Sequence, residues 1–313
     1  MCWGLPHTDN NRTFFLRVYF TCMQEHTYTL LDAGNFQKLE QVGSFRMIRP
    51  APQAAWRAEL PAKEWEQVDA TFTRFSGGKG RWDVRQKDMP AQWTIDVPVG
   101  TMVLKRSSFG HIGMFAEQMT YWKTLHNLTT HTVTQCGECR VLNLFAYTGG
   151  STLACAAGGA SIVHVDASKP TVAWARENAA ASHLEDASIR WIVDDVQKFA
   201  AREVRRKSTY HGIILDPPSY GRGPQGQAWN IEENLPHLLQ DLARLLDTEF
   251  SFIHLSAHSA NFSALVLENC LRAYFPTSSG TFRTEEMLIP SQGTFPLPSG
   301  ASSLFSRIPY GDQ

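Results

Sequence analysis

The sequence predicts an α/β protein in which a parallel sheet follows a smaller β-rich module. From Arg140 onward, apolar runs of four to six residues alternate with helical stretches, which is the pattern of βαβ units. Between residues 27 and 105, short alternating runs are separated by Gly and Pro, which indicates short strands. We therefore expect an extension without an assigned fold (1–26), a β-rich module (27–105) and an α/β domain (106–313) that opens with a connector (106–139).

The composition limits the class of protein. Apolar residues make up 43% of the chain and charged residues 19%, as in a globular protein with a sizeable core. The net charge of −1 excludes a protein that binds nucleic acid through a positive charge spread over its whole surface. Residues 1–130 carry 15 Lys or Arg against 12 Asp or Glu, so a polyanion would favour the front half. No apolar run reaches the roughly 18 residues of a membrane span. The six cysteines fit a reducing compartment, so we expect a cytoplasmic protein.

The apolar segment Phe14–Met23 has a superficial similarity to a targeting signal. Arg17 interrupts it, and no small-residue cleavage site follows. We interpret the segment as a strand or an upstream extension.

Strand patterns occur in both parts of the chain. The apolar runs that predict parallel strands are Val141–Phe145, Ile162–Asp166, Ile189–Val193, Gly212–Asp216 and Phe250–Ser256. Two late runs, Thr281–Leu288 and Ser302–Ile308, are expected to close the sheet as an antiparallel pair. In the β-rich module, the clearest strand patterns are Thr27–Asp32, Phe45–Ile48 and Trp93–Val97.

Helices are predicted between the parallel strands. Ser168 can cap a helix that has Pro170 in its first turn, where a missing amide is harmless. Apolar residues within Val196–Val204 recur at helical spacing and form one face. The further helical segments are Ile231–Leu246, Phe262–Phe275 and the connector 109–126, which runs into a helix.

The loop after the first parallel strand contains the pair Gly149 and Gly150, which lets the backbone approach a ligand closely. The NAD fingerprint G-x-G-x-x-G is absent, because Ser151 stands where its second glycine would be. The sequence therefore disfavours a pyrophosphate cradle and leaves a smaller nucleoside site or a tight structural turn.

Acidic residues follow the second and third parallel strands. Asp166 is predicted to accept hydrogen bonds from ribose hydroxyls, since Ser168 already offers the cap of the next helix. Asp195 is predicted to accept a hydrogen bond from an adenine amino group, with Val196 against the ring. A helix cap explains one member of the Asp194–Asp195 pair equally well.

The fourth parallel strand ends in the most informative stretch, Asp216-Pro217-Pro218-Ser219-Tyr220. Two consecutive prolines cannot continue a central strand and instead fix a stiff turn. The turn would present the Asp216 carboxylate and backbone carbonyls to a cleft, and Tyr220 would add an aromatic face. Such a platform suits a flat group with amino protons, namely a nucleobase, although a purely structural turn remains the alternative.

These stretches together resemble class I S-adenosylmethionine-dependent methyltransferases, and more narrowly the bacterial large-subunit (23S) ribosomal RNA base methyltransferases. The matching stretches are Tyr28–Pro52, Gly113–Gln118, Val141–Thr152, His164–Lys169, Trp191–Phe199 and Ile214–Pro224. The resemblance implies a Rossmann-like, seven-stranded methyltransferase sheet, S-adenosyl-L-methionine as cofactor, and RNA contacts made by residues 27–105.

The resemblance also implies roles for single residues. The implied cofactor-binding residues are Phe115, Gln118, Phe145, Ala146, Thr148, Gly149, Gly150, Asp166, Ala167, Ser168, Asp195 and Val196. The implied catalytic residues, which would face the target base, are Asp216, Pro217, Pro218 and Tyr220.

The sequence departs from those relatives that methylate carbon 5 of cytosine. That carbon becomes nucleophilic only after a cysteine adds to the ring. Neither Asp216–Ser219 nor Leu255–Ser259 contains a cysteine, while Cys155 and Cys270 fall on predicted helices. We therefore favour a nitrogen as the methyl acceptor.

Other residue clusters have competing interpretations. Cys136 and Cys139 form half of a zinc or redox motif, but no second C-x-x-C follows, so we expect no metal. His258, after the fifth strand, is either a substrate contact or a surface histidine. The basic residues Arg202, Arg205, Arg206 and Lys207 complement a helix dipole more simply than they bind RNA.

A second basic stretch stays open between two interpretations. It interleaves cationic with aromatic residues: Phe72, Arg74, Phe75, Lys79, Arg81, Trp82, Arg85 and Lys87. Phosphate contacts with base stacking would have this pattern, and so would an ordinary hairpin with aromatic residues inside.

The predicted function is an S-adenosylmethionine-dependent methyltransferase acting on a nucleobase of ribosomal RNA. The rivals are a non-catalytic RNA-binding protein on a methyltransferase scaffold and a protein amide methyltransferase. A nicotinamide oxidoreductase is disfavoured by the missing second glycine.

Overall fold

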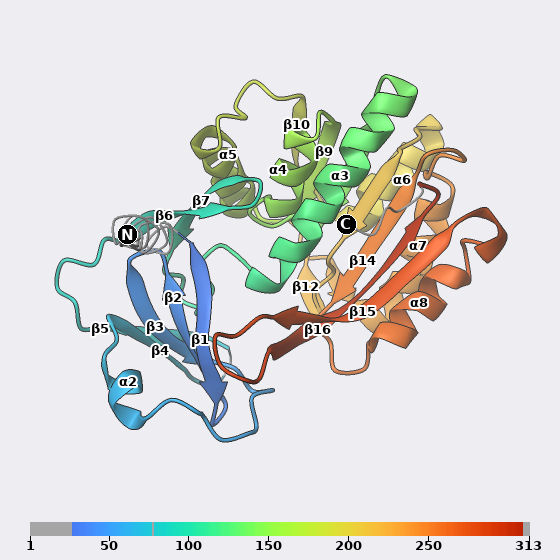
Figure 1. Ribbon diagram of the computed structural model, residues 1–313. Coiled ribbons are helices and arrows are strands. Elements are labelled where there is room, and N and C mark those ends of the chain that lie inside the picture. Colours follow the sequence, from blue (N-terminus) through green and yellow to red (C-terminus); the bar gives the residue numbers. More distant parts are fainter. Residues whose placement is uncertain (1–26, 77, 309–313) are drawn as a thin grey trace, which may run out of the picture.

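The computed structural model describes residues 27–76 and 78–308 and contains two large sheets, joined by a connector and a long helix, and two two-stranded sheets (Figure 1). The predictions for residues 1–26, including the segment Phe14–Met23, lie outside the described residues. Within the described ranges, none of the helices combines the length and the apolar character that crossing a membrane requires.

The larger sheet contains seven strands in the order β10–β9–β8–β11–β14–β16–β15. Their bounds are β8 Arg140–Leu144, β9 Ser161–Asp166, β10 Ile189–Val193, β11 Gly212–Leu215, β14 Phe252–Ala257, β15 Thr281–Ile289 and β16 Leu297–Ser306. Within this sheet, the five neighbouring strands β10, β9, β8, β11 and β14 are parallel, whereas β16 runs antiparallel to β14 and β15. The predicted parallel strands and the closing pair are confirmed, although β16 begins before the predicted Ser302.

The order of the strands opens a crevice at one edge of this sheet. The chain enters at β8, adds β9 and β10 on one side, and then crosses to β11 on the other side. The loops that follow β8 and β11 therefore leave the sheet in opposite directions, and ligands of open α/β sheets bind at this switch point.

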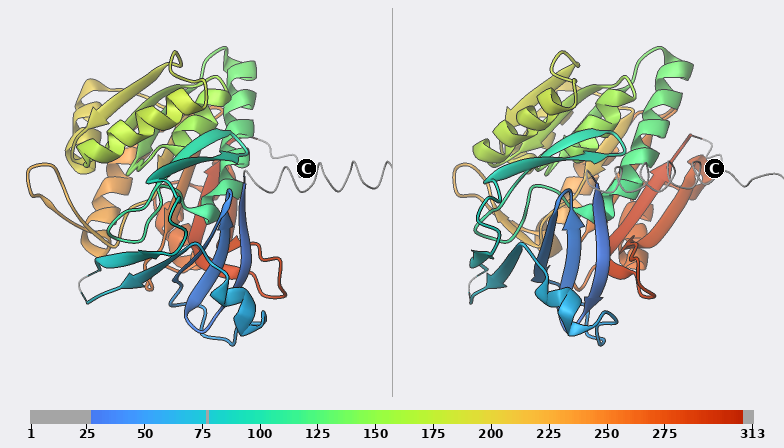
Figure 2. Two further views of the ribbon diagram at one scale, coloured as in Figure 1. Left: turned by 90° about the vertical axis from the view of Figure 1, so that its left-hand side faces the viewer. Right: turned by 60° about the vertical axis from the view of Figure 1, so that its left-hand side comes forward.

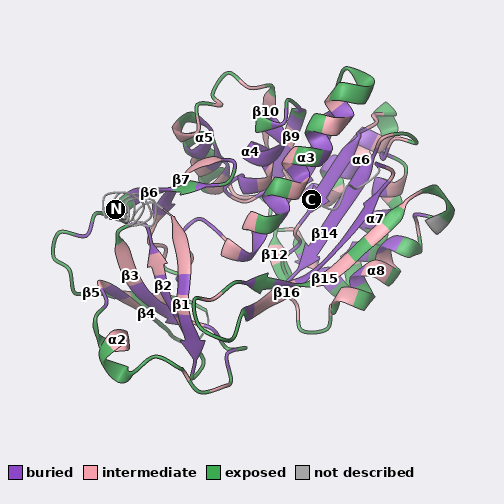
Figure 3. Ribbon diagram, viewed as in Figure 1, coloured by how far each residue is buried: buried purple, intermediate pink, exposed green. Residues whose placement is uncertain are grey.

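Helices cover both faces of the larger sheet (Figures 1 and 2). Their bounds are α3 Met119–Cys136, α4 Gly150–Ala157, α5 Lys169–Ala181, α6 Val196–Arg206, α7 Ile231–Ala243 and α8 Ala264–Arg272. Successive strand residues point to opposite faces, so Val141 packs with α3 and α4 while Leu142 packs with α6 and α7. Burial on both faces explains the uninterrupted apolar runs of the central strands (Figure 3).

The helix ends follow the local sequence. The Ser168 side chain accepts a hydrogen bond from the Thr171 amide, with Pro170 in the first turn, as predicted. At the end of α6, Arg206 pairs with Glu203 at 2.7 Å, which agrees with a structural role for this basic cluster. Helices α7 and α8 are shorter than their apolar patterns, since α7 ends at Ala243 and α8 spans Ala264–Arg272.

The N-terminal sheet has the order β1–β2–β3–β4–β5. Its strands are β1 Tyr28–Gly34, β2 Gln37–Val42, β3 Phe45–Pro50, β4 Ala70–Arg74 and β5 Gly80–Val84, and the short helix α2 spans Ala62–Glu66. The basic and aromatic stretch forms the β4–β5 hairpin, in which Phe72 lies opposite Trp82 and is 2% exposed. Phe75 and Arg81 remain exposed on the hairpin.

A two-stranded ribbon, β6 Gln92–Val97 and β7 Gly100–Lys105, packs against α5. The Val103 amide donates to Asn178 Oδ1 at 2.8 Å, and Trp174 Nε1 donates to the Val103 carbonyl at 2.7 Å. Asn178 Nδ2 also donates to the Thr148 carbonyl at 2.8 Å, in the loop after β8. The ribbon thus shares a core with the larger sheet, and the domain boundary after Lys105 stays a prediction.

A buried ion pair stabilises the N-terminal sheet and joins it to the connector. Arg49 on β3 donates to both carboxylate oxygens of Glu40 on β2, at 2.7 and 2.8 Å, and to the Gly110 carbonyl at 3.0 Å. Burial by itself would raise the pKa of Glu40, but Arg49 and Lys38 outweigh it and lower that pKa to about 2.

Candidate active site

Two adjacent cavities lie at the carboxyl ends of the central strands, where the switch point predicts a ligand site. The large cavity has a volume of about 380 Å³, and the small cavity about 40 Å³. Four residues belong to the walls of both: Phe115, Phe145, Tyr147 and Asp216. The two cavities therefore form one continuous candidate site.

The structure brings together nearly all of the predicted site residues around these cavities. The predicted residues that line the large cavity are Phe115, Phe145, Asp166, Ala167, Ser168, Asp195, Val196, Asp216, Pro217 and Pro218. Those that line the small cavity are Phe115, Gln118, Phe145, Ala146, Thr148, Gly149, Gly150 and Asp216. Tyr220 is 60% exposed and lines neither cavity. The roles of these residues toward cofactor and base stay predictions.

The loop after β8 is a tight, strained turn. Phe145 and Tyr147 adopt φ angles of 53° and 48°, in the left-handed region that side chains other than glycine seldom occupy. Gly149 follows with φ 88° and caps α4. A Cβ at Gly150 would lie 2.2 Å from the Trp122 ring, so only glycine fits there. This geometry leaves the backbone bare toward the small cavity.

Asp166 supports the same loop from the end of β9. Its carboxylate accepts hydrogen bonds from the amides of Tyr147 and Ser168, each at 2.9 Å. Burial raises the pKa of Asp166, and these two amide donors oppose that rise. Because a carboxylate has about four acceptor positions, it retains capacity for the hydroxyls of a guest in the large cavity.

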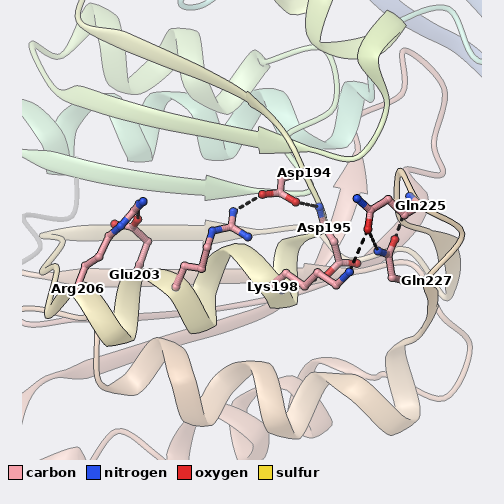
Figure 4. A network of polar contacts seen from close by, with 8 residues as sticks. Asp194, Asp195, Lys198, Glu203, Arg206, Gln225 and Gln227 are labelled. Atoms are coloured by element: carbon pink, nitrogen blue, oxygen red, sulfur yellow. Dashed lines mark hydrogen bonds and ion pairs between the residues drawn. The ribbon is translucent and has the colours of Figure 1, made fainter.

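Asp195 is both a helix cap and a cavity residue. It accepts a hydrogen bond from the Lys198 amide at 2.9 Å and so caps α6, which confirms the capping interpretation for this member of the pair. Asp194 instead forms an ion pair with Arg202. Lys198 reaches Gln225 at 3.3 Å in the loop of the hairpin formed by β12 (Tyr220–Arg222) and β13 (Ala228–Asn230), beside Asp195 (Figure 4).

Asp216 is held by donors from two other elements. The Ser256 hydroxyl, on β14, donates to Oδ1 at 2.7 Å, and Gln118 Nε2 donates to Oδ2 at 3.2 Å. Gln118 belongs to the 3₁₀ turn η1 (Ala116–Gln118) of the connector. After Asp216 the turn is also fixed, because Trp229 Nε1 donates to the Pro218 carbonyl at 2.7 Å. The carboxylate therefore has a defined position at the junction of the two cavities.

Aromatic rings that the sequence analysis did not select form much of the wall. Trp229 packs on Phe145 with ring centroids 4.7 Å apart, and Tyr147 packs on Phe115 at 5.2 Å. Tyr147 could have been selected, because it lies in the loop after the first parallel strand. Trp229 carries no local motif and reaches the cavity only through the β12–β13 hairpin. Aromatic faces of this kind bind flat rings and cations.

Cysteine chemistry and metal binding find no support among the described residues. None of the cysteines that the structure describes lines either cavity. Burial raises the pKa of both Cys139 and Cys155 to about 12, so these thiols are inert. Across residues 27–76 and 78–308, no three or more His, Cys, Asp or Glu side chains gather as metal ligands.

A family model described as an S-adenosylmethionine-dependent methyltransferase matches residues 113–273. A solved SAM-dependent methyltransferase from Agrobacterium tumefaciens is 35% identical, with a TM-score of 0.85 and 90% of each chain covered. Its similarity extends over both sheets.

Curated relatives match a shorter part of the chain. Ribosomal RNA large subunit methyltransferase K/L of Shewanella baltica is 32% identical over 124 residues, which are 39% of this chain and 17% of the relative. Ribosomal RNA large subunit methyltransferase I of Aeromonas salmonicida is 30% identical over 159 residues, which are 50% of this chain and 38% of the relative. The chain thus spans less than half the length of either relative.

Proposed function

Because the chain belongs to the S-adenosylmethionine-dependent methyltransferase family, we propose that it methylates a nitrogen of a nucleobase in ribosomal RNA. The membership makes the protein a methyltransferase with S-adenosylmethionine as its cofactor. The observation that carries the finer proposal is the Asp216 carboxylate, fixed by Ser256 and Gln118 at the junction of the two cavities.

The residues around the cavities fit this cofactor, which supplies an electrophilic methyl group on a sulfonium sulfur when bound. Asp166 retains acceptor positions for two ribose hydroxyls, and Asp195 with Val196 forms an acceptor beside an apolar wall for adenine. The bare backbone at Gly149 and Gly150 would lie along the methionine end.

The turn after β11 would orient the target base. Asp216 and the neighbouring carbonyls would accept hydrogen bonds from the amino group of the base, which leaves the lone pair of its nitrogen less delocalised into the ring. Phe145 and Trp229 offer faces on which a flat ring stacks. Orientation of this kind can lower the barrier of a bimolecular reaction by about 7–11 kcal/mol.

A nitrogen acceptor agrees with the side chains of the site. Methylation at carbon 5 of cytosine would need a thiolate within reach of the ring. The turn after β11 carries Ser219 and the end of β14 carries Ser256, and no described cysteine lines the cavities.

RNA is the substrate that best fits the surroundings of the cavity. The names of the curated relatives specify ribosomal RNA of the large subunit. In this chain, exposed Arg81 and Lys79 lie on the β4–β5 hairpin, and Trp82 Nε1 donates to the Ser107 carbonyl at 2.8 Å. The connector then continues to His111, which lines the large cavity. The cationic hairpin is therefore connected to the wall of the large cavity through Ser107 and the connector, where phosphate contacts could position an RNA.

The proposal is tested with RNA from a strain that lacks the protein. Mass spectrometry of its nucleosides is expected to miss one methylated base, and purified protein with S-adenosylmethionine is expected to restore it. Label incorporated into protein instead would indicate an amide methyltransferase. A protein that does not bind the cofactor in calorimetry would be a non-catalytic RNA-binding scaffold.

A further inference from the structure

A buried carboxylate stands behind the candidate site without a described role. Glu117, on the 3₁₀ turn η1, is 4% exposed. Its Oε1 lies 3.7 Å from Nδ1 of His258, the histidine that follows β14. The other ring nitrogen, Nε2, lies 3.6 Å from Oδ1 of Asp216. His258 thus stands between a buried carboxylate and the carboxylate that faces the target.

The nearby cations are engaged elsewhere. Arg49 binds both oxygens of Glu40, and Lys38 lies 3.0 Å from the same carboxylate, so they act on Glu117 only from a distance. Among the described residues, the ion pairs within 4.0 Å give Glu117 one partner, His258. A buried carboxylate is costly unless it is paired, and among the described residues the His258 imidazole is placed to pair with Glu117.

The ring of His258 is placed for exchange with both the site and water. It stacks on Phe115 with centroids 6.0 Å apart, and a Cβ at Gly300 would lie 2.7 Å from Nδ1. His258 lines the large cavity and also a neighbouring groove of about 680 Å³. Its side chain is 36% exposed, so a proton taken up in the cavity has a path to solvent.

The distances to the two carboxylates are ion-pair distances and exceed hydrogen-bond lengths. Nε2 is therefore free to accept a proton from a guest, as catalytic contacts often tighten only when the substrate is bound. The ionisable groups that face the ring are Glu117 from η1, Asp216 from the turn after β11, His111 from the connector, and Glu286 from β15 across the groove.

Methylation of an amino nitrogen requires a proton acceptor. One N–C bond forms, the C–S bond breaks with its electron pair left on sulfur, and one N–H proton leaves the nitrogen. Methylation of a ring nitrogen that carries no hydrogen releases no proton. A proton acceptor positioned in the site therefore favours an amino nitrogen over a ring nitrogen without a hydrogen as the target.

We propose that His258 accepts the proton released in the reaction and that the target is an exocyclic amino group of a base. Glu117 would position the His258 ring and stabilise the positive charge that the ring then carries. The inference rests on the proposed function and adds the chemical class of the acceptor nitrogen. His258 is then a catalytic residue and Glu117 a positioning residue.

The test compares variants in single turnover with RNA from the strain that lacks the protein. His258→Gln and His258→Ala are expected to slow methyl transfer by about 100-fold, the lower end for general-base catalysis. Calorimetry should give a cofactor Kd within twofold of wild type. Added imidazole should restore part of the rate of His258→Ala. Glu117→Gln should lower kcat less than the His258 variants do, and its KM should be unchanged.

The pH profile supplies a second readout. The wild-type rate should fall toward acid pH, because a protonated imidazole cannot accept a proton, and this fall should be absent from His258→Gln. His237→Ala, which removes an exposed histidine of α7, is the matched control and should behave as wild type.

Several outcomes would overturn the inference. They are an active His258→Gln, a slow His258→Ala that imidazole does not rescue, and a product methylated at a ring nitrogen without a hydrogen. If the wild-type protein transfers no methyl group to RNA, the proposed function fails as well. An active wild type with an equally active His258→Gln removes only the role of His258.

Discussion

The Ser256 hydroxyl donates a hydrogen bond of 2.7 Å to the Asp216 carboxylate and so joins the ends of the neighbouring strands β14 and β11. Gln118 donates to both Asp216 and Ser256, at 3.2 and 3.1 Å, and adds the connector to the same contact. Three separate segments of the chain thus fix one carboxylate. Its position depends on the fold, and its loss should affect chemistry more than cofactor binding.

Replacement of Asp216 by alanine should reduce turnover strongly. If the carboxylate holds the amino protons of the base, its loss should lower kcat by about 10²–10³, as for other preorganised groups that act on the reacting centre. The cofactor Kd, measured by calorimetry, should stay within twofold. An equal loss of turnover and cofactor affinity would assign Asp216 to the cofactor instead.

Asp166→Asn should have the opposite effect. A hydrogen bond to a charged group contributes about 1.5–3 kcal/mol, so the cofactor Kd should rise by about 10–100-fold. The turnover rate at saturating cofactor should change little. Unchanged affinity would argue against ribose binding, and circular dichroism checks that the loop around Tyr147 still folds.

Arg49→Met should be strongly destabilising. It leaves the Glu40 carboxylate, 0% exposed, without its bidentate partner, which typically costs about 3–5 kcal/mol in the free energy of unfolding. The matched control is Arg46→Met on the same strand, whose partner Glu64 is half-exposed, with an expected loss of at most about 1 kcal/mol. Urea unfolding measures both, and similar losses would contradict this difference.

The same ion pair predicts a dependence of stability on pH. The pKa of Glu40 is about 2 in the folded protein against 4.5 for the free group, so deprotonation favours the folded state. This stabilisation is complete above about pH 4.5 and is lost as the pH falls toward 2. In Glu40→Gln, the urea midpoint should change less over this range, and an identical pH dependence would exclude Glu40 as its source.

RNA binding should depend on the β4–β5 hairpin. The double variant Lys79→Glu, Arg81→Glu should weaken RNA binding and reduce the slope of log K against log salt by about 2, or roughly one per lost phosphate contact. Arg205→Glu with Lys207→Glu, at the C-terminal end of α6, makes the same change of charge and should leave the slope unchanged. If the two pairs behave alike, the hairpin has no special part in binding RNA.

Much of the larger sheet could be predicted from the sequence because its strands are buried on both faces. Such strands appear as uninterrupted apolar runs, and loops at their carboxyl ends carry Gly149, Asp166 and Asp216. The helix caps were also predictable, since Ser168 acts through its own neighbouring amides. Sequence patterns therefore predicted the strands, the loops after them and the helix caps, because each of these depends on neighbouring residues of the chain.

The rest depends on contacts between distant segments. Trp229 packs on Phe145 because the β12–β13 hairpin folds back, and the same hairpin leaves Tyr220 60% exposed. Glu117 and His258 approach each other across the connector and β14. No spacing along the chain records such encounters, so the sequence alone left His258 between two interpretations.

The contacts of Asn178 with Val103 and Thr148 have a consequence for how this protein can be divided. A fragment beginning at residue 106 would lose the β6–β7 ribbon, uncover the apolar side of α5 and leave the Trp174 indole without its carbonyl acceptor. Such a fragment should aggregate. A fragment of the α/β half therefore needs the ribbon, and the ribbon is itself bonded to the N-terminal sheet, because Trp93 Nε1 donates to the Val42 carbonyl at 3.2 Å.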